Sequence, residues 1–193
     1  MDPFIEKEIF DQQIYDKIDP DDQMIDGGSH IGLSALYFAG QKGNVTAIEP
    51  DRRNLELLRS NIDLNPDLSI KVIPNPLWYR EGYVNFHTVL NSGNNSIVPY
   101  GFDRNILKLR AIPLNDLLPT DDLKLDVEGS EYQIIKYSDI NKVRKRIMLE
   151  YHKHVKDFEI EFEILKYKIK LSGFKITRLE DHGYNGYLSA KRV

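Results

Sequence analysis

Three carboxylates stand close together in the second half of the chain, at Asp126, Glu128 and Glu131. They lie at and just beyond the end of residues 122–127, whose apolar pattern predicts a buried strand. Neighbouring carboxylates raise one another's pKa, which moves one of them toward useful basicity near neutral pH. Because such a base can activate a hydroxyl, we predict Glu128 as the catalytic base and Asp126 as the second choice. The alternative is that Glu128 caps the helix beginning near Ser130 and that Glu131 favours its N-terminus.

A second pair of candidates, Glu150 and His152, falls at the end of the next predicted strand, residues 146–151. Side chains two positions apart on a strand share one face. His152 is therefore a further candidate catalytic base or acceptor contact, although a lone histidine at a strand end is more often structural. The same two residues, with Asp126 and Glu128, could instead gather a divalent cation through hard oxygen ligands. We predict no resident metal.

A glycine-rich turn connects a predicted buried strand, residues 23–27, to a predicted helix, residues 31–41. Such a turn lets a ligand approach the backbone and the helix N-terminus. Asp26 discriminates between ligands, because its carboxylate would repel the pyrophosphate of a dinucleotide but suits the ammonium and sulfonium charges of S-adenosylmethionine. The predicted cofactor is therefore S-adenosylmethionine. The cofactor contacts expected from this turn are Asp26, Gly28, Ser29, His30 and Gly32.

An acid expected to hold the ribose, Glu49, comes 21 residues after Gly28 and closes the predicted strand 44–49. A carboxylate there can accept hydrogen bonds from both ribose hydroxyls. Taken alone, it could also be a helix-capping acid. Asn75, just past the third predicted strand, is expected to contact the adenine, because an amide both donates and accepts hydrogen bonds. A turn role for Asn75 is the alternative, and the loop 91–96 could also close on the cofactor.

Strand and helix signals alternate over the first two thirds of the chain, which indicates a parallel sheet covered by helices on both faces. The predicted fold class is therefore α/β and Rossmann-like. Strands are expected at residues 23–27, 44–49, 69–73, 122–127 and 146–151, and helices at 31–41, 51–64, 130–137 and 157–171. Segments 174–179 and 186–191 flank a turn with Gly183 and Asn185, so they should form a C-terminal antiparallel hairpin.

A single domain spanning residues 1–193 is expected from the length of the chain. Within it, residues 1–20 are predicted to form a leading helix that ends near Asp19-Pro20. That prediction rests on isoleucines at helix-like spacings, at Ile5, Ile9, Ile14 and Ile18. Residues 75–113 carry weaker signals, with strands expected at 83–89 and 107–112, and we interpret them as an insertion at the rim of the site.

The composition excludes several classes of protein. Lys and Arg number 26 against 30 for Asp and Glu, a formal net charge of −4, so no basic field is available to hold nucleic acid. The absence of cysteine excludes disulfides, thiolate zinc sites and cysteine nucleophiles. Charged residues interrupt the N-terminal segment, and no long apolar stretch follows, so neither a signal peptide nor a membrane span is expected. The expected location is cytoplasmic.

Taken together, four segments resemble the FkbM family of methyltransferases. The segments are IDGGSHIGLS at residues 25–34, AIEPD at 47–51, LKLDVEGSE at 123–131 and LEYH at 149–152. The resemblance implies a seven-stranded class I methyltransferase sheet, S-adenosylmethionine as methyl donor and, commonly, O-methylation of hydroxyls on sugars, glycolipids or polyketides. Ser29 and His30 depart from the Ala-Asn usual in the family, which implies a different loop shape beside the methionine moiety.

Three other functions remain alternatives. An N-methyltransferase acting on protein or nucleic acid usually presents Asn-Pro-Pro-Tyr at the fourth strand, and Asn75-Pro76-Leu77-Trp78 looks similar but follows the third. A nicotinamide-dependent oxidoreductase would share the glycine turn and the ribose acid, but Asp26 speaks against it. A non-catalytic S-adenosylmethionine-binding domain would keep the fold without turnover. The acceptor is expected to be a small molecule or carbohydrate, and the oligomeric state is not predicted.

Overall fold

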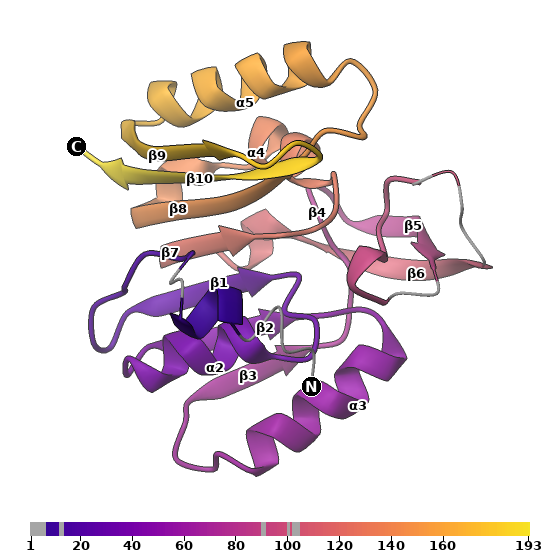
Figure 1. Cartoon of the computed structure of the whole chain (residues 1–193), viewed down its shortest axis with the longest axis vertical. Helices are drawn as coiled ribbons and strands as arrows, with labels where there is room; N and C mark the ends of the chain where they lie inside the picture. The colour runs from indigo at the N-terminus through magenta and orange to yellow at the C-terminus, as the bar shows by residue number, and fades with distance from the viewer. Residues whose placement is uncertain (1–6, 12–13, 90–91, 100, 102–104) are drawn as a thin grey trace.

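A seven-stranded sheet forms the centre of the protein in a computed structural model that describes residues 7–11, 14–89, 92–99, 101 and 105–193 (Figure 1). The strand order is β3-β2-β1-β7-β8-β10-β9. The strands are β1 (Gln23–Gly27), β2 (Asn44–Ile48), β3 (Ile70–Ile73), β7 (Thr120–Leu125), β8 (Val143–His152), β9 (Phe174–Asp181) and β10 (Asn185–Arg192). The first five pair in parallel, and β10 is antiparallel to both β8 and β9. The α/β class, the seven strands and the C-terminal antiparallel pair are therefore confirmed.

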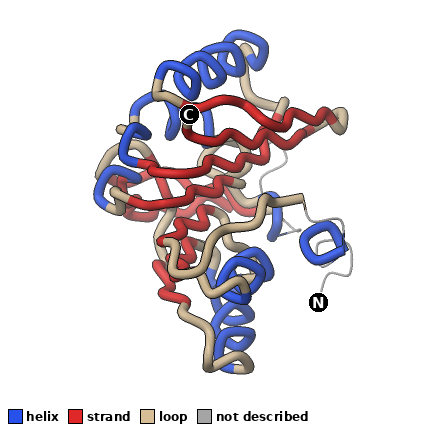
Figure 2. Tube along the Cα trace, turned by 90° about the vertical axis from the view of Figure 1, so that its left-hand side faces the viewer, coloured by secondary structure: helices blue, strands red, loops and turns tan. Residues whose placement is uncertain are grey.

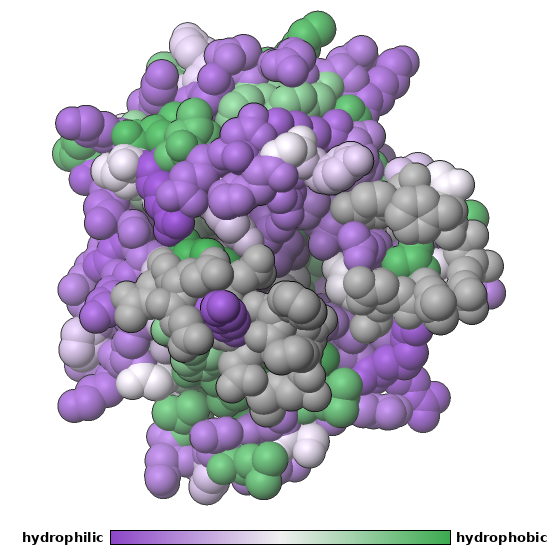
Figure 3. Space-filling model, in the orientation of Figure 1, coloured by the Kyte–Doolittle hydropathy of each residue, from purple (hydrophilic) through white to green (hydrophobic). Residues whose placement is uncertain are grey.

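Helices cover both faces of the sheet, because successive strand residues point to opposite faces. The helices are α2 (Leu33–Gly40), α3 (Arg52–Asp63), α4 (Glu131–Tyr137) and α5 (Phe158–Leu171). Ile25 and Leu149 pack in the core that includes α4 and α5, whereas the adjacent Met24 and Met148 pack in the core that includes α2 and α3. Figure 2 shows the strands twisting from one end of the sheet to the other. On the face seen in Figure 3, hydrophilic residues predominate and apolar ones form small separate patches.

A smaller sheet occupies the stretch between β3 and β7, where a rim insertion was predicted. Its strands are β4 (Leu77–Trp78), β5 (Gly82–Thr88) and β6 (Asn105–Pro113), in the order β4-β6-β5. Strands β5 and β6 pair in antiparallel register and project to one side of the main sheet in Figure 1. Both predicted strands of this stretch are therefore present. In the part of the chain that the structure describes, no helix has the length and apolar character needed to cross a membrane.

The N-terminal segment departs from the prediction of a leading helix. Its described helical part is a short π-helix, η1 (Lys7–Asp11), and residues 14–20 are irregular. Tertiary hydrogen bonds replace helical ones here: Arg178 Nη1 donates to the Ile14 carbonyl at 2.6 Å, and Arg146 Nη1 donates to the Lys17 carbonyl at 2.7 Å. Ile9, Ile14 and Ile18 are nevertheless buried in the core that includes α2, so the spacing of these residues predicts their burial but not a helix; Ile5 lies outside the described residues.

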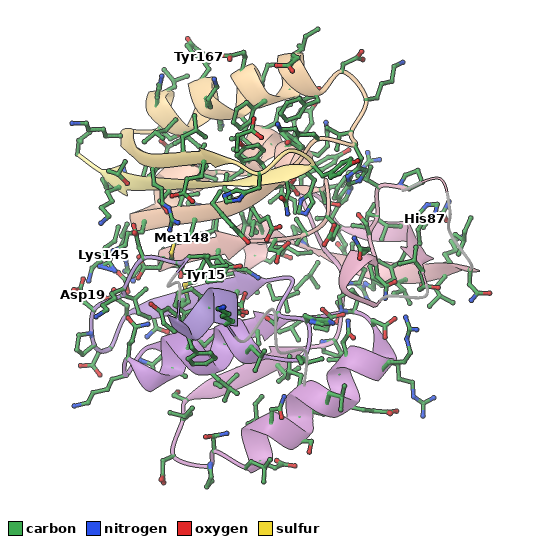
Figure 4. The ribbon with its side chains drawn as sticks, viewed as in Figure 1. Tyr15, Asp19, His87, Lys145, Met148 and Tyr167 are labelled. Carbon is green, nitrogen blue, oxygen red and sulfur yellow. The ribbon has the colours of Figure 1, made fainter. Side chains whose placement is uncertain are left out.

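Charged side chains fasten the same segment to the sheet. Lys145 Nζ lies 3.1 Å from Asp19 Oδ2, and the two residues meet at one edge of the molecule in Figure 4. Lys145 also pairs with Asp22, which is buried. Side chains from the start of β8 and from β9 therefore hold the segment, which packs in the core that includes α2.

Beneath this segment, Asp122 is fully buried on β7, with Arg146 Nε at 3.7 Å from its Oδ1. Burial, with a smaller contribution from the neighbouring Asp22 carboxyl, raises the pKa of Asp122 to about 8. In the unfolded chain the same group would titrate near pH 3.9. The folded protein therefore keeps a proton between about pH 4 and 8 that the unfolded chain releases.

We expect Asp122→Asn to flatten the pH dependence of stability. In the parent, the stabilisation linked to this proton is complete below the unfolded pKa and is lost as the pH rises through the folded pKa of about 8. The slope is at most about 1.4 kcal/mol per pH unit. Asparagine cannot ionise, so the melting temperature of the variant relative to the parent should rise between pH 5 and pH 8.5. A constant difference across this range would contradict the raised pKa.

Candidate active site

The glycine turn after β1 packs directly against the end of β7. Gly28 has φ +78°, and a Cβ built there would lie 1.7 Å from the Asp126 carbonyl oxygen. The turn is also fastened to β2, because the Gly28 and Ser29 amides both donate to the Ile48 carbonyl, at 3.0 and 3.1 Å. Only glycine fits a left-handed position at this separation. The two strands on either side of β1 therefore fix the shape of the turn.

Glu49 follows β2 and binds the same turn. Its Oε2 accepts from the His30 amide at 3.0 Å, and its Oε1 accepts from the Asp51 amide at 2.8 Å and from Asn54 Nδ2 at 3.2 Å. Burial raises the pKa of Glu49 to about 8, against the lowering effect of these hydrogen bonds. Near neutral pH its carboxyl is therefore mostly protonated, and can both donate to and accept from a ligand hydroxyl.

Three acids converge beyond the ends of β7 and β8, where Asp126, Glu128 and Glu150 line the same cavity. Glu128 has φ +55°, a conformation that is uncommon for a side chain larger than glycine and recurs at functional sites. Ser96 Oγ donates to its carbonyl at 2.5 Å and so holds this turn in place. Burial raises the pKa of Glu150 to about 8, and the charge of Asp126 adds to the shift. Asp126 and Glu128 are thus close together, as the sequence predicted, and Glu150, which the sequence grouped with them as a possible cation ligand, joins them; Glu131 of the predicted cluster does not line the cavity.

His152 lies behind these acids and connects them. Its Nε2 lies 3.2 Å from Glu128 Oε2, and its Nδ1 lies 3.2 Å from Glu131 Oε1. Burial would lower the pKa of His152, but the charges of Glu131 and Glu128 outweigh it and raise the pKa well above the ordinary value. At neutral pH the ring is therefore an imidazolium that donates to both carboxylates. A protonated histidine cannot accept a proton, and His152 is not among the residues that line the cavity, so this geometry favours a role in positioning Glu128 over the predicted role as a base.

Glu131 is fully buried and belongs to this network. Its Oε2 accepts from the Gly129 amide at 2.9 Å, and its Oε1 accepts from the His152 amide at 2.9 Å. The alternative that Glu131 favours the start of α4 is consistent with its place in the first turn. Its contacts show that it also fixes the turn that presents Glu128.

A loop at the rim, residues 93–97, closes one side of the cavity. The His87 amide donates to the Ser96 carbonyl at 2.7 Å, which joins the loop to β5. Figure 4 labels His87 on the projecting sheet. Asn95 Nδ2 donates to Asp51 Oδ2 at 2.7 Å, so the loop is also fastened to the start of α3. The predicted closure of loop 91–96 on the site is supported for residues 93–96, whereas residue 91 lies outside the described residues.

These elements enclose a cavity of about 330 Å³, a size within the usual range for small-molecule sites. It lies beyond the carboxyl ends of β1, β2, β7 and β8, where chain order reverses and open α/β sheets bind ligands. The model of the methyltransferase FkbM domain matches residues 26–185, which include all of these strand ends. The chain belongs to the FkbM family. Members of this family are S-adenosylmethionine-dependent methyltransferases, so the predicted class and cofactor are confirmed at family level.

Solved structures agree with this assignment of fold. The FkbM methyltransferase of Methylobacillus flagellatus is 18% identical, with a TM-score of 0.67 over 96% of this chain and 47% of that protein. Fibrillarin from Aeropyrum pernix, with natively bound S-adenosylmethionine, is 12% identical over 89% of this chain and 67% of its own, with a TM-score of 0.56. The magnesium protoporphyrin IX methyltransferase of Synechocystis, with bound S-adenosylmethionine, is 11% identical over 100% and 77%, with a TM-score of 0.52.

The chain spans about half the length of the Methylobacillus protein. No curated protein is similar to it in sequence. At these identities the structural likeness shows the fold alone. It is the family match that identifies the chain as an FkbM methyltransferase and sets aside the nicotinamide-dependent oxidoreductase.

Two residues predicted to touch the cofactor lie elsewhere in this FkbM domain. Asp26 is fully buried and does not line the cavity; its Oδ2 accepts from Ser34 Oγ at 2.7 Å, and its Oδ1 lies 3.1 Å from Lys124 Nζ. Asn75 donates through Nδ2 to the Arg110 carbonyl at 2.9 Å, so it joins the chain after β3 to β6. Its position also removes the likeness to an N-methyltransferase motif, because the fourth parallel strand is β7.

The other predicted cofactor contacts are close to the cavity. Gly28, Ser29, His30 and Glu49 line it, whereas Gly32 lies just behind, where its left-handed backbone starts α2 against Leu58. The sequence interpretation missed Lys124, which lines the cavity although it is 1% exposed. A lysine between two leucines in a buried strand was the available signal, because such a charge requires a partner.

Asp126, Glu150 and His152 of the FkbM domain are also arranged so that one ligand atom of each lies within 4.8 Å of the others. This geometry could accommodate a cation. His152, however, already holds a proton between two carboxylates, and a metal would have to displace it. The expectation that no metal is resident therefore stays a prediction.

Proposed function

We propose that this FkbM methyltransferase transfers a methyl group from S-adenosylmethionine to a hydroxyl oxygen of a small molecule or carbohydrate. The observation that carries the proposal is Glu128, a carboxylate on the cavity wall whose other side is held by the His152 imidazolium. Methyl transfer is an in-line displacement, and a base is needed only when the nucleophile is weakly acidic. A carboxylate in this place therefore suits an alcohol better than an amine.

The residues of the cavity fit the methyl donor. Four carboxyl groups line it, at Glu49, Asp126, Glu128 and Glu150, against the single buried ammonium of Lys124. Glu49 and Glu150 are mainly protonated near neutral pH, so the negative charge is that of Asp126 and Glu128, which suits a ligand with a sulfonium and an ammonium charge. Glu49, at the β2 end, would bind the ribose hydroxyls, while Asp126 and Glu128, at the β7 end, would lie near the transferred methyl. When bound, the donor supplies a carbon already activated for displacement.

We assign the base to Glu128. His152 donates to Glu128 Oε2, which holds the carboxylate in one orientation at the cavity wall, where the acceptor hydroxyl would bind. Glu150 is the competing base, because its raised pKa of about 8 makes it a strong acceptor once it is ionised. Below that pH Glu150 is mainly protonated, and its carboxyl can donate to an acceptor oxygen instead. The two acids therefore differ in the pH range over which they could accept a proton.

The remaining wall of the cavity favours a small acceptor with both apolar and polar surfaces. Tyr15 and Tyr187 line it with their rings in an edge-to-face pair, 6.4 Å between centroids. Asn185 also lines it and donates through Nδ2 to Glu150 Oε1. Aromatic faces with a nearby amide and carboxyl suit a ring that bears hydroxyl groups. The net charge of −4 disfavours a nucleic acid.

A screen of labelled methyl transfer tests the proposal. Purified protein would be incubated with S-adenosylmethionine carrying a labelled methyl group and with panels of sugars, glycolipids, small alcohols, peptides and amines. We expect label to be transferred to an oxygen, which mass spectrometry of the product would locate. Transfer to nitrogen, or binding of the donor without transfer to any hydroxyl, would overturn the assignment.

We expect Glu49→Ala to weaken binding of both S-adenosylmethionine and its demethylated product about 10- to 100-fold, as measured by calorimetry. The reason is the loss of hydrogen bonds worth about 1.5 to 3 kcal/mol to the ribose hydroxyls. Glu56→Gln is the matched control, because Glu56 is exposed on α3 and pairs with Arg52. Unchanged affinity in the Glu49 variant would remove the ribose site from this end of the cavity.

A further inference from the structure

Lys124 is a buried cation at the edge of the cavity. It lies on β7 between Leu123 and Leu125 and is 1% exposed. Its Nζ donates to the Gly28 carbonyl at 2.8 Å and lies 3.1 Å from Asp26 Oδ1. Burial would lower the pKa of Lys124, but the charges of Asp26 and Asp126 outweigh it and raise the pKa. The side chain therefore remains an ammonium ion.

The ammonium has three N–H donors, of which one is used by the hydrogen bond to the Gly28 carbonyl, while Asp26 Oδ1 is an ion-pair partner at 3.1 Å. Asp126 Oδ2 lies 3.7 Å away, beyond hydrogen-bond distance. Lys124 lines the cavity and Asp26 does not, so the remaining donor capacity faces the cavity. The Tyr15 ring, 5.6 Å from Nζ at its centroid, covers this region, and Figure 4 shows Tyr15 close to β1 at the centre of the molecule.

We propose that Lys124 binds the α-carboxylate of the methionine moiety of the methyl donor, with Asp126 beside it for the α-ammonium. An amino acid carries both charges on one carbon, and the cavity presents a cation and an anion 3.7 Å apart. Asp26, which the sequence assigned to the methionine end, then acts through Lys124 as its buried counter-ion. This inference rests on the proposed placement of the donor in the cavity.

Strand order supports the assignment. Glu49 follows β2 and Asp126 follows β7, with β1 between them. Neighbouring strands lie about 4.8 Å apart, so these two ends of the cavity are separated by about 10 Å. The donor must span such a distance, because its ribose and its amino-acid carbon lie on opposite sides of the sulfonium sulfur, at the two ends of the chain that joins them. With the ribose at Glu49, the zwitterion reaches Lys124 and Asp126.

A purely structural role is the rival explanation, since Lys124 also fastens the Gly28 turn to β7. The two roles differ in which ligands lose affinity. Loosening the turn would weaken every adenosine ligand, whereas loss of a carboxylate contact would weaken only ligands that carry the amino acid. S-adenosylhomocysteine carries it, and 5′-methylthioadenosine does not.

The experiment titrates these two ligands into three variants. Lys124→Met combined with Asp26→Asn removes both charges of the buried pair and leaves no orphaned carboxylate at Asp26. Asp26→Asn alone is the intermediate variant, because it keeps Lys124 but removes the counter-ion that raises its pKa. We expect the double variant to lose about 10- to 100-fold in affinity for S-adenosylhomocysteine and less than about threefold for 5′-methylthioadenosine, in line with one charge-assisted contact. Asp26→Asn should lose less affinity for S-adenosylhomocysteine than the double variant does, and Glu49→Ala should weaken binding of both ligands.

Equal losses for the two ligands in the double variant would overturn the proposal in favour of the structural role, and unchanged affinities would overturn it outright. If Glu49→Ala also left both affinities unchanged, the placement of the donor would fail as well, which separates the two hypotheses. If the double variant does not fold, ligand binding to the parent protein provides the test. It should bind decarboxylated S-adenosylhomocysteine at least about tenfold more weakly than the intact molecule; equal binding would overturn the proposal.

Discussion

A Glu128→Gln enzyme is expected to bind the methyl donor as tightly as the parent and to transfer the methyl group about 10²- to 10⁴-fold more slowly, the usual contribution of a positioned base. Glutamine keeps the shape of the side chain and removes its basicity. His152 can still donate to the amide oxygen, so the turn that presents residue 128 should keep its structure. Single-turnover rates and melting temperatures measured on the same samples would establish both parts of the expectation.

Two matched variants identify which acid is the base. Asp126→Asn and Glu150→Gln remove the neighbouring acids one at a time, with donor affinity as the control for damage to the cavity. If Glu150 were the base, the parent rate would rise with pH through its pKa of about 8 and Glu150→Gln would abolish that rise. A turnover near the parental value in Glu128→Gln, accompanied by a lower melting temperature, would instead assign Glu128 to capping α4.

Gly28→Ala is expected to destroy donor binding and to destabilise the fold by several kcal/mol. Its Cβ would lie 1.7 Å from the Asp126 carbonyl oxygen, at a backbone φ of +78°. Strain at such a position costs about 1 to 3 kcal/mol before the clash is relieved. Relief requires the turn to separate from β7, which would also break the Lys124 hydrogen bond to the Gly28 carbonyl. Thermal unfolding and calorimetric titration with S-adenosylhomocysteine would measure the two effects.

Gly40→Ala is the comparison for this substitution. It lies at the end of α2, and a Cβ there would meet nothing within 4 Å. Alanine in place of glycine in a helix stabilises by roughly 0.5 to 1 kcal/mol, so this variant should melt at or slightly above the parent. If Gly28→Ala and Gly40→Ala had the same melting temperature and the same affinity for S-adenosylhomocysteine, the turn would be able to move away from β7 at little cost, and Gly28 would not determine its shape.

Local patterns predicted the strands, the glycine turn and the helix at residues 51–64. That helix is α3, and Asp51 caps it by accepting from the Arg53 and Asn54 amides, because capping depends on neighbours two and three residues away. Glu49 and Glu128 lie on the cavity because the carboxyl ends of parallel strands meet at one edge of the sheet. Each of these features could be predicted from the residues of one short segment, or from the rule that the carboxyl ends of parallel strands meet at one edge of the sheet.

The errors occur where distant side chains determine the outcome. The isoleucines near the N-terminus have helical spacing, but Arg178 and Arg146 bond the backbone there and prevent a continuous helix. Asp26 has the right charge for a cationic ligand, but Lys124, 98 residues later, compensates it. His152 could be assigned no protonation state until Glu131 and Glu128 were placed around it. Each of these required contacts that no single segment contains.

Part of the cavity wall lies outside the residues that the family match covers. Ile14 and Tyr15 form part of the cavity wall, yet both precede residue 26, where the family match begins. The segment is fastened by side chains of β8 and β9, so it can change in sequence without disturbing the strand ends that bear Glu49 and Glu128. A substitution at Ile14 or Tyr15 would therefore reshape the cavity wall outside the residues that the family match covers, while the strand ends that bear Glu49 and Glu128 stay in place.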